Sequence, residues 1–209
     1  MEFEAIISLG WRCTPAFQLQ RKQIRKQAFP LDWLITAKFD SVIKLFETNF
    51  ENFLDPVVDK TNKYRRGLVL KNSQYPGLIF RHENVIENKE RMLRRVKRLQ
   101  ELLLSESRVL FIRLLKTRKS PFTRRMDSNK RTKILDQGHN FQKALEHHKL
   151  NPSILFLIEK GESPIPEPVY KQNNIEIVAA RCWEAAGLFK EGKRPDLEKT
   201  WDLLLSRYV

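Results

Sequence analysis

The sequence predicts an α/β domain of three layers, in which helices flank a mostly parallel sheet of about five strands. Two observations support this fold class. Short, continuous apolar runs alternate with segments of helical periodicity, as expected for a parallel sheet that is buried on both faces. The chain has 209 residues, 41% of them hydrophobic, and shows no internal repeat and no linker long enough to divide it. We therefore expect a single domain over residues 1–209.

Each predicted strand is a short apolar run that ends at a turn or at a charged residue. The five runs cover residues 3–9, 78–81, 108–115, 152–158 and 175–179. Two segments between them are predicted to be mainly loop. One is 49–75, which is rich in Asn, Asp and Lys and has at most a brief strand at 68–70. The other is 161–168, which contains three prolines.

Five helices are predicted between and after these strands. Thr14 followed by Pro15 is typical of a helix start, because threonine can cap a helix and proline fits its first position. Apolar residues at helical spacing predict the next helices over residues 38–47, 87–104 and 130–148. A last helix is expected to begin at Asp196, which follows a proline.

The chain is strongly basic. It has 39 Lys and Arg against 25 Asp and Glu, a net charge of +14, which favours an anionic substrate and weak, salt-dependent binding of nucleic acid. Half of this excess lies in a predicted basic loop, residues 116–133, with eight Lys or Arg and one Asp. The two distant cysteines, Cys13 and Cys182, indicate a reducing compartment. Since no signal peptide or membrane segment is evident, we expect a cytoplasmic protein. The cysteines and histidines do not form a metal-binding pattern, so we expect no metal, and we expect no other cofactor.

The residues that end the predicted strands are candidates for a site, because open α/β sheets bind ligands beyond the carboxyl ends of their strands. Cys13 follows the first strand and would lie at a helix N-terminus, where the macrodipole favours a thiolate. His82 follows the second strand and is the candidate general base, with Asp32 or Glu83 to orient its ring. Four arginines are candidate ligands of an anionic substrate: Arg12, Arg81, Arg113 and Arg181.

Part of this pattern resembles a known family. The relevant residues are Ser8-Leu9-Gly10, Cys13, Ala16, Leu19 and Arg25, followed by Pro30, Asp32 and Trp33. They resemble a domain family of bacteria and viruses that is described as a “putative papain-like cysteine peptidase”. The resemblance implies that Cys13 is a nucleophile, that His82 is its base and that Asp32 is a third member. The acidic residue after the histidine is often aspartate in that family, whereas here it is Glu83.

The fold that this resemblance implies is an alternative to the one predicted from the alternation of strands and helices. A papain-like fold is α+β, and its helix-borne cysteine is preceded by a glutamine. Here only twelve residues precede Cys13, and none of them is glutamine. The predicted strand, turn and helix around Cys13 instead look like the nucleophile segment of α/β esterase-type hydrolases.

Three functions remain open at this point. The first is a thiol-dependent hydrolase of the peptidase, amidase or esterase type, or an acyl transferase, with Cys13 as nucleophile and His82 as base. The alternative is a basic module that binds a phosphate, a nucleotide or nucleic acid without thiol chemistry. The third is a catalytically inactive domain that keeps the fold and binds a partner.

Overall fold

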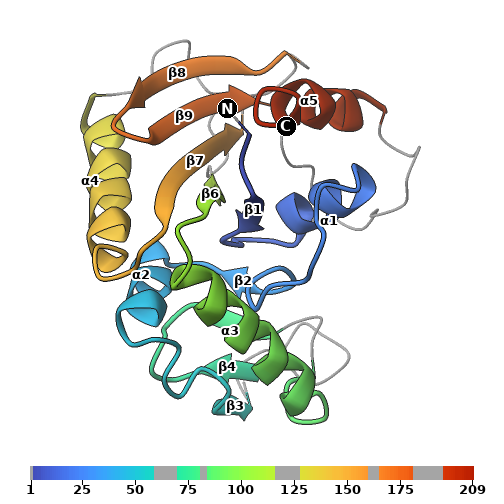
Figure 1. Cartoon of the computed structure of the whole chain (residues 1–209), viewed down its shortest axis with the longest axis vertical. Coiled ribbons are helices and arrows are strands. Elements are labelled where there is room, and N and C mark those ends of the chain that lie inside the picture. Colours follow the sequence, from blue (N-terminus) through green and yellow to red (C-terminus); the bar gives the residue numbers. More distant parts are fainter. Residues whose placement is uncertain (1, 59–69, 81–83, 116–127, 160–164, 181–194) are drawn as a thin grey trace.

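A computed structural model of the chain describes residues 2–58, 70–80, 84–115, 128–159, 165–180 and 195–209 (Figure 1). Strands and helices form two sheets and their covering layers. The helices are α1 (Thr14–Arg21), α2 (Phe39–Glu47), α3 (Lys89–Leu103), α4 (Ser128–Ala144) and α5 (Pro195–Leu205). The strands are β1 (Ala5–Ser8), β2 (Ile35–Thr36), β3 (Pro56–Val58), β4 (Leu70–Asn72), β5 (Leu78–Phe80), β6 (Arg108–Leu115), β7 (Asn151–Glu159), β8 (Glu167–Gln172) and β9 (Ile175–Ala180).

The larger sheet has five strands in the order β1-β6-β7-β9-β8. The first four run parallel, and only β8 pairs antiparallel, at the edge. This confirms the predicted α/β class with its mostly parallel sheet. The sequence placed the start of β8 in a loop because of its prolines. Proline is tolerated on an edge strand, where one side of the backbone has no partner to lose.

The smaller sheet is antiparallel, with the order β2-β5-β4-β3. It corrects the sequence prediction, in which residues 78–81 belonged to the parallel sheet. These residues form β5, which pairs with β2 and β4 instead. The segment predicted as loop, 49–75, also contributes β3 and β4 to this sheet. Strands of two or three residues are too short to show the periodicity by which strands are recognised in a sequence.

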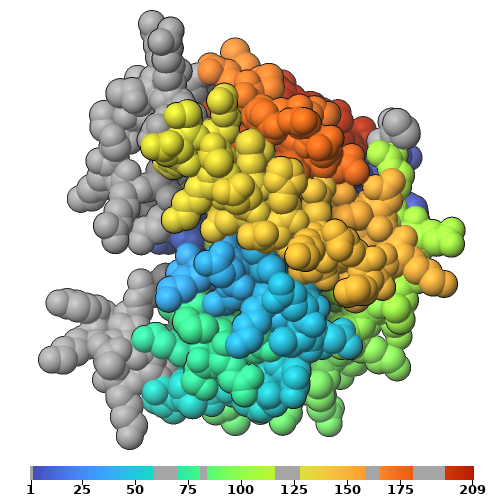
Figure 2. Space-filling view, turned by 90° about the vertical axis from the view of Figure 1, so that its left-hand side faces the viewer, coloured from blue at the N-terminus to red at the C-terminus, as the bar shows by residue number. Residues whose placement is uncertain are grey.

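Helices cover both faces of the parallel sheet, which gives the three predicted layers. On one face α2 and α4 lie side by side, as Figure 2 shows, and aromatic side chains attach them to β6 and β7. On the other face Leu19 of α1 and Trp201 of α5 are fully buried in one apolar cluster that includes Leu155 and Leu157 of β7. The smaller sheet shares the core of the α2 and α4 side. Among the described helices, none combines the length and apolarity that crossing a membrane requires.

Candidate functional site

The turn between β1 and α1 is tight and conformationally strained. Gly10 and Trp11 both adopt left-handed backbone conformations, with φ of +75° and +68°. Glycine tolerates this region, and at Gly10 a Cβ atom would also lie 2.7 Å from Thr36 Oγ1. A bulky residue such as Trp11 enters the region only when its surroundings enforce it. The turn is therefore held from outside, and it leads directly to Cys13.

Cys13 lies at the N-terminus of α1, as the sequence predicts, but it is itself the N-cap, and Thr14, the residue expected to cap the helix, is the first helical residue. Cys13 carries a thiol rather than a disulfide and is 6% exposed. Its side chain does not cap the helix, and Pro15 occupies the first turn. The backbone N–H groups of the first helical turn are candidate donors to a developing oxyanion. Pro15 has no N–H and the Phe17 amide donates to the Cys13 carbonyl (2.9 Å), which leaves the Thr14 and Ala16 amides as the candidates between residues 14 and 17.

Thr36 of β2 supports the turn from the smaller sheet. Its hydroxyl oxygen accepts a hydrogen bond from the Trp11 amide (2.6 Å), and the hydroxyl donates to the Leu9 carbonyl (3.0 Å). Sequence analysis did not single out Thr36. The one signal for it was a threonine next to an apolar run, which is too common to indicate a site.

Arg113 lies beneath the same turn, in the middle of β6, and is 2% exposed. Its guanidinium donates to the Leu9 carbonyl (3.0 Å), to the Thr36 carbonyl (2.5 Å) and to the Thr36 hydroxyl. It also lies over the ring of Phe39, at 5.1 Å from the centroid. Burial lowers the pKa of Arg113 to about 9, so the group is charged at neutral pH. The sequence predicts Arg113 as an anion ligand, whereas its guanidinium, within the described part of the chain, contacts the protein's own oxygen atoms and one ring.

Of the other predicted anion ligands, Arg12 is half-buried, and its guanidinium lies 4.8 Å from the centre of the Trp11 ring. The Trp11 ring thus holds the positively charged side chain of Arg12, the residue before Cys13, by a cation–π contact. Arg81 and Arg181 lie outside the described residues, as do His82, Glu83 and Cys182. The roles assigned to these five residues remain predictions.

Asp32 lies in the loop before β2 and is 1% exposed. Its Oδ2 accepts hydrogen bonds from Arg25 (2.8 Å) and from the Phe29 amide (2.9 Å). Among the described residues, its buried Oδ1 has no hydrogen-bond partner. Burial raises the pKa of Asp32, and the Phe29 amide and the Arg25 guanidinium oppose this effect. One carboxylate oxygen is thus anchored, and the other can accept a further donor.

The smaller sheet also corrects the prediction for the strand that precedes His82 in the sequence. The sequence placed this histidine after a strand of the parallel sheet, next to Cys13. That prediction is wrong about the sheet, because His82 follows β5, a strand of the antiparallel one. In that sheet Leu78 lies opposite Thr36 and Ile79 opposite Ile35, so β5 runs toward the end of β2 that Asp32 precedes.

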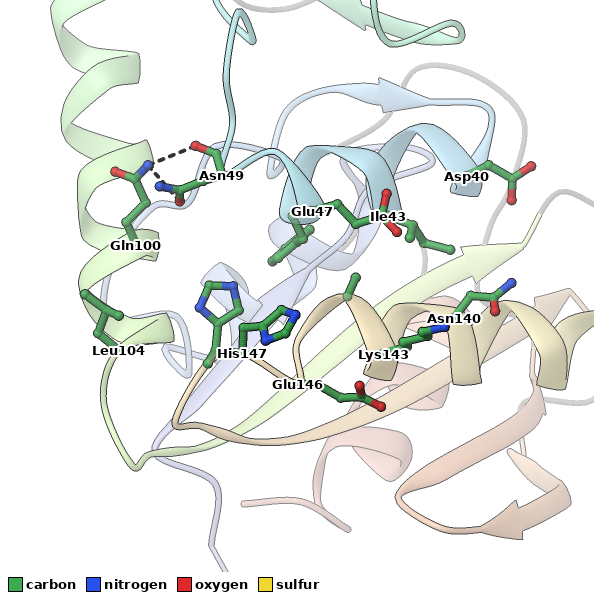
Figure 3. A pocket seen from close by; sticks show the side chains of 13 residues that line it. Asp40, Ile43, Glu47, Asn49, Gln100, Leu104, Asn140, Lys143, Glu146 and His147 are labelled. Atoms are coloured by element: carbon green, nitrogen blue, oxygen red, sulfur yellow. Dashed lines mark hydrogen bonds between the residues drawn. The ribbon is translucent and has the colours of Figure 1, made fainter.

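A cavity of about 820 Å³ lies away from this turn, between α2 and the C-terminal ends of α3 and α4 (Figure 3). Gln100 and Asn49 form one end of it, and His147 extends into it. His148, another lining residue, has a pKa lowered by burial and by the neighbouring His147. Cys13 is not among the residues that line this cavity. No sequence motif marks it, because its walls come from separate helix ends.

Comparison with protein families gives one match that covers most of the chain. A family model described as “Putative papain-like cysteine peptidase” matches residues 4–158, a range that includes β1, the Cys13 turn, the smaller sheet and β6. Comparison with curated proteins and with solved structures gave no match.

Proposed function

We propose, because the chain belongs to the family described as “putative papain-like cysteine peptidase”, that it is a thiol-dependent hydrolase or acyl transferase with Cys13 as its nucleophile. The observation that carries this proposal is the position of Cys13. The residue follows a strained turn at the carboxyl end of β1 and begins α1. In open α/β sheets this is where ligands bind, and a helix N-terminus favours the thiolate that attacks an electrophile.

The proposed reaction is an acyl transfer in two steps. Cys13 Sγ forms a bond to the carbonyl carbon of the substrate, and His82 takes the thiol proton. The carbonyl oxygen then carries the negative charge, which the Thr14 and Ala16 amides stabilise. His82 returns the proton to the leaving nitrogen or oxygen as its bond to carbon breaks, and a thioester remains. Water then releases the acid in a hydrolase, or a second nucleophile takes the acyl group in a transferase.

Asp32 is proposed to orient His82. The direction of β5 toward the Asp32 end of β2 supports this pairing, since His82 follows Phe80 by two residues. The buried Oδ1 of Asp32 provides an acceptor for an imidazole N–H, while Arg25 and the Phe29 amide hold the other oxygen in place. Arg12, Arg81 and Arg181 are proposed to attract an anionic part of the substrate.

Selective alkylation tests the nucleophile. The chain is treated with iodoacetamide near neutral pH, and the modified fraction of Cys13 and of Cys182 is followed by peptide mass spectrometry. We expect Cys13 to react far faster than Cys182, and His82→Gln to slow the reaction of Cys13 alone. Equal and slow modification of both cysteines in the wild-type chain would contradict the proposal.

Acyl transfer itself is tested with p-nitrophenyl acetate. We expect a burst of p-nitrophenol equal to the amount of protein, together with an acetyl group on Cys13, because acylation precedes hydrolysis. Cys13→Ser should remove the burst. An undiminished burst in Cys13→Ser would assign the reaction to another group.

A further inference from the structure

We propose that Thr36 and Arg113 are positioning residues for Cys13, which hold the Gly10–Trp11 turn in its left-handed conformation and so fix the thiol at the start of α1. The inference rests on the proposed function, since the quantity that it explains is the reactivity of Cys13. Neither residue acts on the substrate in this proposal. Both act through the backbone that precedes the nucleophile.

The hydroxyl of Thr36 uses its full bonding capacity on this turn. A threonine hydroxyl has one hydrogen to donate and two lone pairs that accept. Here the hydrogen goes to the Leu9 carbonyl, and the two lone pairs accept from the Trp11 amide and from Arg113. The contact to the Trp11 amide acts directly on a residue with φ of +68°. A hydroxyl at this position therefore stabilises the strained backbone two residues before Cys13.

Arg113 joins the turn to the two sheets. It extends from β6 of the parallel sheet, and its two terminal nitrogens contact Leu9, after β1, and Thr36 in β2. Only a planar guanidinium presents donors in a fork that can reach both carbonyls from one side chain. Lysine would retain the charge and lose this geometry.

The charge of Arg113 makes a second contribution. Removing a cation from water is unfavourable unless its hydrogen bonds are replaced, and here the replacements are carbonyl and hydroxyl oxygens. No carboxylate among the described residues forms an ion pair with it, so its positive charge remains beneath the turn. A positive charge there favours the thiolate form of Cys13, in the same direction as the N-terminus of α1.

The test measures the pH dependence of Cys13 alkylation in a Cys182→Ser background, where Cys13 is the one remaining thiol. Thr36→Val removes the hydroxyl and keeps the shape, and Thr36→Ser restores the hydroxyl. The matched control is Thr200→Val in α5, because Thr200 is also fully buried and its hydroxyl also donates to a backbone carbonyl, that of Asp196 (2.9 Å). Arg113→Lys is a second test variant that keeps the charge. Far-UV circular dichroism establishes that each variant is folded.

We expect Thr36→Val to lower the alkylation rate at pH 7 by about three- to tenfold and to move the midpoint of the profile to higher pH, since the thiol loses its place at the helix terminus. Arg113→Lys should move it in the same direction, and Thr36→Ser and Thr200→Val should stay close to the parent. A low midpoint in the parent that neither Thr36→Val nor Arg113→Lys changes would overturn the positioning role and leave the nucleophile intact. A parent midpoint at about pH 8.5, that of an ordinary thiol, would instead overturn the proposed function.

Discussion

Replacing Phe141 with leucine tests the aromatic cluster that attaches α2 and α4 to the parallel sheet. Phe141 is fully buried, and its ring centroid lies 5.0 Å from that of Phe46, 5.1 Å from Phe111 and 5.7 Å from Phe39. The first two pairs meet nearly edge-on, at 84° and 83°. Phe39 in turn packs against Arg113, so the cluster also supports the site.

The magnitude follows from the three contacts. Each aromatic pair contributes about 0.5–1.5 kcal/mol beyond the burial of apolar area. Leucine keeps most of that area and loses all three ring contacts, so the free energy of unfolding should fall by about 2–4 kcal/mol. The matched control is Phe3→Leu, since Phe3 is partly buried and its ring makes one tilted aromatic contact, with Tyr208 at 6.2 Å, and one cation–π contact, with Arg108 at 5.1 Å. We expect a loss of about 1 kcal/mol there, because both contacts are partly exposed.

Urea unfolding followed by far-UV circular dichroism measures both variants, and the free energies are compared at equal m values. A loss in Phe141→Leu no larger than that in Phe3→Leu would refute this reasoning. It would mean that the cluster fills space without directional contacts between its rings.

Three further predictions concern the site and its charge. Gly10→Ala should destabilise the fold by about 1–3 kcal/mol in urea unfolding, because alanine is strained at φ of +75° and its Cβ would meet Thr36 Oγ1; an unchanged midpoint would contradict this. Burial raises the pKa of Asp32 in the folded protein. Protonation of Asp32 therefore stabilises the fold fully below the unfolded pKa of 3.8, and this stabilisation is lost as the pH rises through the folded pKa. Asp32→Asn should therefore gain stability relative to wild type as pH rises from about 4 to about 7, and a constant difference would argue against it. Lys130 and Arg131 are exposed at the start of α4, and their joint replacement by glutamine should weaken binding of single-stranded DNA and reduce its salt dependence, measured by fluorescence anisotropy. Binding that does not depend on salt would exclude a charge-driven interaction.

The parallel sheet was predictable because its strands carry their own signal. The interior of β6 reads Val-Leu-Phe-Ile, and the run is buried on both faces, which produces a continuous apolar segment. The antiparallel sheet was not predictable in this way. β2 has two residues and β3 has three, and their pairing depends on a register that is set across long loops. For this reason the prediction that His82 follows a strand of the parallel sheet was wrong.

The site divides in the same way. Cys13 could be found from its local sequence, since a short strand, a glycine and a Thr-Pro pair predict the turn and the helix start. The contacts of Thr36 and Arg113 could not, because Arg113 bonds to a carbonyl 104 residues earlier in the chain. The signal in the sequence is an arginine that follows the apolar run Val-Leu-Phe-Ile. The sequence interprets Arg113 as a ligand-binding group, and in the structure its guanidinium donates to the backbone carbonyls of Leu9 and Thr36.

The pairing of β1 with β6 has a consequence for the order of folding. Ala5 lies opposite Val109, so β1 and β6 enclose a long intervening segment that contains the whole antiparallel sheet. Closing so long a segment carries an entropic cost, and sheets with such non-local pairings fold slowly. On the ribosome, Cys13 is synthesised long before Arg113 exists to hold its turn. The thiol therefore acquires its fixed position only after β6 has emerged and paired with β1. Any reaction of Cys13 that depends on this position is delayed until that stage of synthesis.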